Sequence, residues 1–204
     1  MINSYRSDHP NHVHQLTVAV SKHYYASKDG ALKYQKKPME ISLSETHASA
    51  RRHMVIYSLR DHCSGVFYSE IAFCPSVPTA QDFLGRAWGR KADYLFHGLP
   101  VLLTIPRTVQ AVFPSLASDA EMLGIKLVDV TSGFQGGIRD LRTIEDSLVL
   151  SINKPIAEAQ DWVNYICVSH AKDASRVHGK TKIELWQQGV PAIRLPAVGW
   201  GSEA

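Results

Sequence analysis

Three histidines near the start of the chain, His9, His12 and His14, have the types and spacing that most suggest a metal-binding cluster. A tetrahedral zinc site would need further nitrogen or sulfur ligands converging from elsewhere in the fold. The first twelve residues are otherwise polar and include Pro10. We therefore expect residues 1–12 to form a solvated arm, and we predict no metal site there.

Thiol and hydroxyl chemistry finds little support. The three cysteines, Cys63, Cys74 and Cys167, are scattered and form no CxxC pair, so neither a zinc ribbon nor a disulfide framework is predicted, and a reducing cytoplasm fits best. A Ser or Cys nucleophile needs a base and an orienting partner. With ten histidines, some Ser–His proximity is expected by chance. No nucleophile-elbow motif is present, and a general hydrolase is disfavoured.

The basic residues permit a nucleic-acid partner without requiring one. Arg51 and Arg52, with His53, form a cluster that could contact phosphate or could simply be a solvated face before a strand. The net charge of the 204 residues is only +3. The chain shows no charged-then-apolar leader and no apolar stretch long enough to span a bilayer. We expect one globular domain with no membrane partner.

The first half of the chain predicts an antiparallel meander of three strands. Residues 13–25 alternate apolar side chains with Gln15, Thr17 and Ser21, so that one face should lie on a core and the other face is neutral. Residues 54–59 and 66–73, joined by a turn, form the clearest hairpin. Between them, residues 39–43 alternate apolar and polar side chains, which suits a short edge strand or an irregular loop.

The second half alternates helices and strands. An amphipathic helix is predicted over residues 80–88, with a capping box from Thr79 to Asp82. An apolar strand at 101–105, a helix from Pro114 to Gly124 and a strand at 125–130 follow. Three glycines predict a flexible loop over 132–137, and helices follow at 138–148 and from Pro155. The fold class is α/β: a five-stranded mixed sheet, with the meander plus two parallel strands and helices on both faces.

Several segments, taken in order from about Val13 to about Leu195, resemble the catalytic core of the retroviral integrase and DDE transposase superfamily, which has an RNase H-like fold. VHQLTVAV stands where such cores have a strand of the type WQLD, and MVIYSLRDHCSGVFYSEI resembles their second and third strands. Late in the chain Lys182 stands where bacterial transposases usually have proline. The remaining segments are GLPVLLTIPRTVQAVF, LGIKLVDV, QGGIRDL, NYICVSH and GKTKIELWQQGVP.

The resemblance implies a two-metal phosphodiester chemistry held by two Asp and one Glu. Their positions here are Thr17, Ile105 and Arg139, and the 33 residues between the last two are close to the spacing that the resemblance implies. A hydroxyl, an alkyl group and a guanidinium cannot hold two magnesium ions, which require carboxylate oxygens. We therefore expect no cofactor, and Mg²⁺ or Mn²⁺ only if other acids replace the missing ones.

Other acids could in principle stand in. Asp61 lies in the hairpin turn, where capping the turn is the alternative role. Asp129 falls on the fifth strand, an unusual place for a ligand in this family. Asp140 and Glu145 are rotated from Arg139 by about 100° and 240° round a helix. These acids do not combine into three on one face.

Nucleic-acid binding is separable from that chemistry. The positions where the resemblance places DNA-contacting lysines hold Thr143 and Asp146, so that contact is not predicted. Arg139 and Arg142 would point near the altered site and could meet a phosphate; an ion pair of these arginines with Asp140 or Asp61 is the alternative. The candidate nucleic-acid contacts are Arg139, Arg142, Arg51 and Arg52.

The sequence thus predicts a polar arm (1–12), an integrase-core-like domain (13–196) and a tail (197–204). We expect a protein of mobile-element origin without strand-transfer activity, with an accessory role and with DNA, a second copy or a mobile-element protein as partner. Two alternatives stay open. One is an active metal-dependent nuclease or transferase using Asp61, Asp129 or Glu145. The other is a protein-interaction module that uses apolar residues near the C-terminus, namely Trp186, Leu195 and Trp200.

Overall fold

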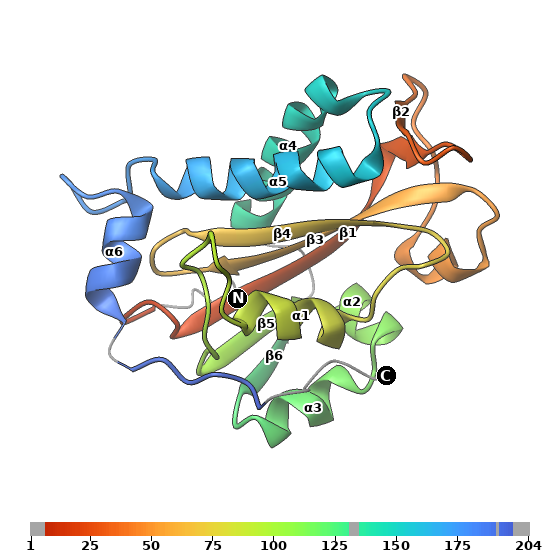
Figure 1. Cartoon of the computed structure of the whole chain (residues 1–204). Helices are drawn as coiled ribbons and strands as arrows, with labels where there is room; N and C mark the ends of the chain where they lie inside the picture. The colour runs from red at the N-terminus through yellow and green to blue at the C-terminus, as the bar shows by residue number, and fades with distance from the viewer. Residues whose placement is uncertain (1–6, 131–134, 191, 198–204) are drawn as a thin grey trace.

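A mixed sheet forms the centre of the protein (Figure 1). The computed structural model describes residues 7–130, 135–190 and 192–197, without the side chains of His47 and Asp129. The strand order is β4-β3-β1-β5-β6, with β2 paired to β1. β3 is antiparallel to β1 and β4, whereas β5 and β6 run parallel to β1. The strands are β1 (Val13–Ala26), β2 (Leu32–Tyr34), β3 (Arg52–Asp61), β4 (Phe67–Phe73), β5 (Leu102–Pro106) and β6 (Lys126–Val130).

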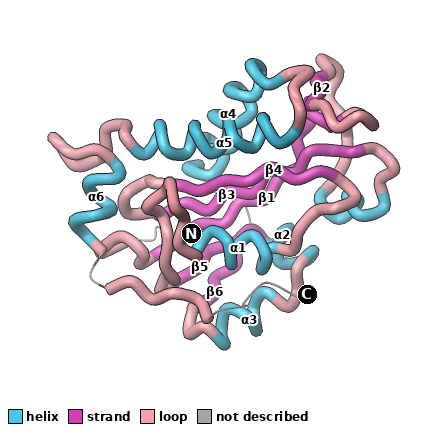
Figure 2. Tube along the Cα trace, viewed as in Figure 1, coloured by secondary structure: helices cyan, strands magenta, loops and turns pink. Residues whose placement is uncertain are grey.

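Helices cover both faces of this sheet (Figure 2). Contacts place α4 on β1 and β3, and α5 on β4, whereas α1 packs on β3 and β4 from the other side and touches α3. The helices are η1 (Leu43–Ala48), α1 (Ala80–Trp88), α2 (Arg107–Val112), α3 (Leu116–Met122), α4 (Gln135–Ser147), η2 (Leu148–Ser151), α5 (Ile156–Ala171) and α6 (Lys182–Gly189). Within the described residues, none of the helices combines the length and apolar composition needed to cross a bilayer.

The predicted α/β class, with a meander, two parallel strands and helices on both faces, is confirmed, with one correction to the strand count. The sheet has six strands because β2 pairs with the end of β1, Tyr34 opposite Tyr24. The edge strand considered at residues 39–43 does not form. Met39 donates its N–H to Lys22 O at 2.7 Å, but Ser42 N donates to Glu45 Oε2 at 2.7 Å and caps η1, so the chain turns into that helix.

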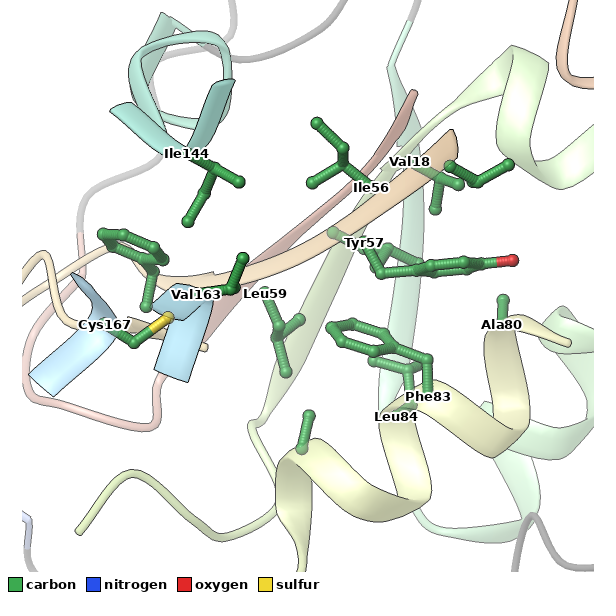
Figure 3. Close-up of a cluster of buried hydrophobic side chains, with 14 of the residues drawn as sticks. Val18, Ile56, Tyr57, Leu59, Ala80, Phe83, Leu84, Ile144, Val163 and Cys167 are labelled. Atoms are coloured by element: carbon green, nitrogen blue, oxygen red, sulfur yellow. The ribbon is translucent and has the colours of Figure 1, made fainter. Parts of the chain in front are cut away.

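The hydrophobic core lies on both sides of the sheet (Figure 3). Tyr57 of β3 meets Phe83 of α1 with ring centroids 5.1 Å apart. On the opposite side, Ile144 of α4 and Val163 of α5 are fully buried. The helix α1 begins at Thr79, whose side chain accepts from Asp82 N in the predicted capping box.

The neutral face of β1 is buried rather than open, because α4 runs along it. Gln15, Thr17 and Ser21 are all buried. At one end Gly137 lies against Thr17, and at the other end the Ser21 hydroxyl donates to Glu145 Oε1. Residues 135–137 therefore begin a helix where a flexible loop was predicted, and residues 132–134 of that loop lie outside the described residues. Glycine is a poor helix former, but here its missing side chain lets α4 approach the sheet.

Candidate functional site

The three positions that the resemblance assigns to metal-binding acids differ in their surroundings. Thr17, in the middle of β1, is 6% exposed, and a Cβ added to Gly137 would lie 2.1 Å from its Oγ1. Ile105 is fully buried on β5, opposite Asp129 of β6. Arg139 is exposed on α4. The helix therefore closes directly on the strand at Thr17, with no space between them for an ion.

The donor atoms around Thr17 do not fit a pair of divalent metals. Thr17, Ser58 and Ser69 are neighbours across β1, β3 and β4, and their hydroxyl oxygens are buried without a hydrogen-bond partner among the described residues. Mg²⁺ and Mn²⁺ prefer carboxylate oxygens to neutral hydroxyls. In the part of the chain that the structure describes, no three His, Cys, Asp or Glu side chains converge as a metal-binding group.

The acids considered as replacements lie apart from one another. Asp61 is fully buried and accepts from Asn11 N at 2.9 Å and from Ser64 N and Oγ, both at 2.6 Å, so it caps the β3–β4 turn. It lies opposite His14, whereas Glu145 bonds Ser21. Seven residues of strand separate those two contacts, roughly 23 Å at 3.3 Å per residue. The side chain of Asp129 lies outside the described part of the chain.

At the N-terminal end of β1, where Gln15 lines it, lies a cavity of about 430 Å³ that we call the arginine pocket. It opens between the start of β1, the β3–β4 turn and the first turn of α4. Among the described residues, its lining contains three guanidinium groups and no carboxylate. The lining residues are Gln15, Arg60, His62, Gly65, Gln135, Gly136, Arg139 and Arg176.

Each arginine is held differently. Arg60 donates from Nη1 to Asp140 Oδ1 at 2.6 Å, and it lies between two glycines, because a Cβ at Gly65 or Gly136 would meet its side chain at 2.8 or 3.0 Å. Arg176 donates to Cys63 O at 2.7 Å and also to His62 O. The guanidinium of Arg139 has no hydrogen-bond or ion-pair partner among the described residues. The guanidinium of Arg139 is therefore available to bind an anion in the pocket.

The pocket is electropositive at neutral pH. Burial lowers the pKa of His62, and the nearby Arg176 and Arg60 lower it further, so the imidazole is neutral and the charge comes from the three guanidinium groups. Asp140 neutralises one of these by its pairing with Arg60. Because Gln135 and Gly136 open α4, the positive end of that helix dipole also faces the pocket. The arrangement suits a phosphate oxyanion and not a metal cation.

The sequence-predicted contacts fall in different places. Arg139 lines the pocket, whereas Arg142 is exposed on α4 and does not line it. An ion pair of Asp140 with Arg139 was the alternative considered from the sequence, but Asp140 pairs with Arg60 instead. Arg52 lies opposite Ala26, whereas Arg60 lies opposite Gln15. Eight residues of β3 therefore separate the Arg51–Arg52 pair from the pocket, roughly 26 Å along the strand.

The histidine cluster does not converge either. His9 and His12 stack on each other with ring centroids 5.2 Å apart. His14 is fully buried; its Nε2 bonds Asn11 Oδ1 at 2.8 Å, and its Nδ1 accepts from Trp88 Nε1 at 3.1 Å. Because both ring nitrogens are engaged inside the fold, His14 is a core histidine.

Two arginines of the pocket were not identified from the sequence. Arg60 could have been noticed, because it is a charged residue that follows the mostly apolar run 54–59 of β3 and lies on the same face as Ser58 and Ile56. Arg176 lies in a polar loop between α5 and α6. Nothing in its local sequence distinguishes it from a solvated arginine, since only the tertiary fold brings it to the β3–β4 turn.

Comparison with known proteins agrees with this fold. No family model and no curated protein sequence matches the chain. The HTLV-2 integrase catalytic core domain, solved in complex with magnesium in a dimeric form, matches with a TM-score of 0.51 and 14% identity, over 89% of this chain and 98% of that one. Its trimeric form matches with a TM-score of 0.50 and 15% identity, over 88% and 99%. The chain has the RNase H-like fold of retroviral integrase catalytic cores.

Proposed function

We propose that this protein is an accessory DNA-binding member of the integrase-like fold, without metal-dependent cleavage, that holds a backbone phosphate in the arginine pocket. The single observation that carries the proposal is the composition of that pocket. Of the three positions where the resemblance implies carboxylates, Arg139 lines this pocket, and Arg60 and Arg176 line it as well. Guanidinium groups bind phosphate oxygens through charge-assisted hydrogen bonds.

The packing of α4 supports the loss of cleavage. Metal-assisted phosphoryl transfer needs carboxylates that hold two ions about 4 Å apart. Here Gly137 fills the space against Thr17, and the nearby carboxylate of Asp140 is already paired with Arg60. A pocket built this way can position a DNA strand, but its described lining offers no carboxylates to hold the two ions.

The test is a pair of assays on the intact chain. Fluorescence anisotropy with a labelled 20-base-pair duplex measures binding of wild type, Arg139→Glu and Lys126→Glu. Lys126, exposed on β6, is the matched control because its substitution makes the same change of net charge away from the pocket. We expect Arg139→Glu to weaken binding at least tenfold and Lys126→Glu to have a much smaller effect.

The second assay incubates supercoiled plasmid with the protein and MnCl₂, with and without a chelator. We expect the plasmid to remain supercoiled in both cases. Site-specific nicking that the chelator abolishes would overturn the proposal and would favour the alternative of an active nuclease. Equal weakening of duplex binding by Arg139→Glu and Lys126→Glu would also contradict phosphate binding in the arginine pocket.

A protein-interaction role is the second candidate, and a surface at the η2–α5 corner favours it. Leu150 is 61% exposed, with Val149 and Tyr165 also exposed beside it, over a cavity of about 590 Å³ that Trp162 lines. Light scattering of wild type and Leu150→Glu tests this role: self-association lost in the variant supports it, and a monomeric wild type contradicts self-association.

The apolar residues near the C-terminus, which the sequence suggested for such a role, differ in exposure. Trp186 is buried against Phe96, Leu195 is exposed, and Trp200 lies outside the described residues.

A further inference from the structure

The end of the sheet farthest from the arginine pocket carries an excess of basic over acidic residues. In Figure 1 this end is where β1 reaches β2. Residues 22–52 hold seven lysines and arginines against three acids, whereas the rest of the chain holds fifteen against sixteen. The positive charge of the protein is therefore concentrated in this segment, which contains the end of β1, β2, η1 and the first residue of β3.

Planar side chains form a connected row on this segment. The Tyr34 ring stacks on His23 with centroids 5.6 Å apart and planes 26° apart. His23 Nδ1 lies 3.0 Å from Gln35 O, and the Gln35 side chain accepts from Arg51 Nη2 at 2.6 Å. The Arg51 guanidinium in turn lies over the Tyr25 ring, 4.0 Å from its centroid. We call this row and its flanking lysines the β2 surface.

Part of the row is open to solvent and preorganised. Tyr34 is 46% exposed, although its backbone is fixed by pairing with Tyr24 in the sheet. Lys22, Lys36 and Lys37 are exposed beside it, and Gln35 N donates to His23 O at 2.9 Å, which holds the connecting segment against β1. The stacking group therefore lies on a strand, with exposed cationic side chains nearby.

We propose that the β2 surface binds single-stranded nucleic acid, with a base stacked on Tyr34 and the backbone phosphates held by Lys36, Lys37 and Arg51. Unpaired bases stack on aromatic rings and guanidinium planes, and a basic border tracks the backbone. In a duplex both faces of each base are already stacked on neighbouring pairs, so the ring of Tyr34 gives no comparable advantage there. This site is separate from the arginine pocket and does not depend on the function proposed for it.

The test uses labelled fifteen-residue thymidine and uridine homopolymers, which stay unpaired, in anisotropy titrations with the intact chain. We expect Tyr34→Ala to weaken binding about tenfold, a typical effect of losing one stacked base, and Tyr34→Phe to bind like wild type. Lys36→Ala/Lys37→Ala should lower the slope of log affinity against log salt by about 1.4, or about 0.7 for each lost phosphate contact. Comparing the two homopolymers shows whether DNA or RNA is preferred.

Two controls separate this site from the arginine pocket and from general charge. Arg139→Glu should leave homopolymer binding within about twofold of wild type, while it weakens duplex binding. Lys126→Ala/Lys180→Ala, a pair of substitutions outside residues 22–52, should change the salt slope by less than the Lys36/Lys37 pair. Circular dichroism establishes that each variant is folded. Unchanged homopolymer binding by folded Tyr34→Ala, or its loss in Arg139→Glu, would overturn the proposal.

Discussion

Gly137 of α4 lies against Thr17 of β1 so closely that a Cβ at residue 137 would come within 2.1 Å of the threonine hydroxyl and 3.2 Å of its Cβ. This contact brings the start of α4 onto the neutral face of β1 and fills the space beside Thr17. It also places Gln135, Gly136 and Arg139 at the rim of the arginine pocket. The contact between Gly137 and Thr17 thus leaves no space for an ion beside Thr17 and brings Arg139 to the arginine pocket.

This contact predicts whether Gly137→Ala raises or lowers the free energy of unfolding. Without it, Gly137→Ala would stabilise α4 by up to about 1 kcal/mol through helix propensity. Against Thr17 the added methyl must displace the helix, and we expect the free energy of unfolding to fall by about 1 to 3 kcal/mol. Adding Thr17→Ala removes the nearest atom and should recover most of the loss in a double-mutant cycle. Urea denaturation of the four proteins measures this, and a stabilised single variant contradicts the packing.

The ion pair of Arg60 with Asp140 predicts that Asp140→Asn changes the stability of the fold and the affinity for DNA in opposite directions. Asp140 is 1% exposed, so Asp140→Asn leaves the arginine partly buried without its counter-charge, and we expect about 3 kcal/mol of destabilisation. DNA affinity should instead rise, because Arg60 is no longer neutralised. Asp146→Asn, at an exposed position on the same helix, is the control and should change unfolding by less than about 0.5 kcal/mol. A loss of DNA affinity in folded Asp140→Asn would show that Asp140 supports binding.

His14 predicts part of the acid sensitivity. Burial lowers its pKa to about 3, below the value of about 6.5 in an unfolded chain. The unfolded state therefore binds more protons between these values, and the stability that His14 contributes is present above pH 6.5 and lost as the pH falls. Burial raises the pKa of Asp61 to about 6, which acts in the opposite direction between about pH 4 and 6.

His14→Gln removes the titrating imidazole, since the amide can still accept from Trp88 and donate to Asn11. Asp61, whose Oδ1 lies 4.0 Å from His14 Nε2, is present in both proteins. The difference in unfolding free energy between wild type and this variant should shift by about 2 kcal/mol against wild type between pH 7 and pH 5. Urea denaturation at both pH values measures the shift. A difference independent of pH would mean that His14 is not held neutral by the fold.

Much of the sheet could be predicted from the sequence, because β1 alternates apolar with neutral side chains and because β3 and β4 are rich in branched and aromatic residues joined by a turn. These three strands lie where they were predicted, and α1 lies at residues 80–88 as predicted. The errors fall where local pattern is weak. β2 has three residues, and only Leu32 among them is buried. The glycines at 136 and 137 favour a loop by propensity, but the packing against Thr17 and Arg60 overrides that preference.

The candidate site could be predicted only in part. Arg139 follows from the resemblance, because its position on α4 was assigned through it. The contributions of Arg60 and Arg176 depend on contacts between residues 80 and 113 positions apart in the chain, which no local pattern encodes. The division of the predicted cations into two groups, Arg139 at the pocket and Arg51 with Arg52 at the far end of β3, likewise appears only in the strand register.

The affinity of the wild-type protein for duplex DNA in excess chelator, compared with its affinity in MnCl₂ at the same ionic strength, tests the central claim most directly. If three guanidinium groups hold the phosphate without metals, the two dissociation constants agree within about twofold, and both weaken steeply as salt is raised. Binding that appears only with manganese would contradict the account and would mean that carboxylates of this chain assemble around an ion when DNA is present.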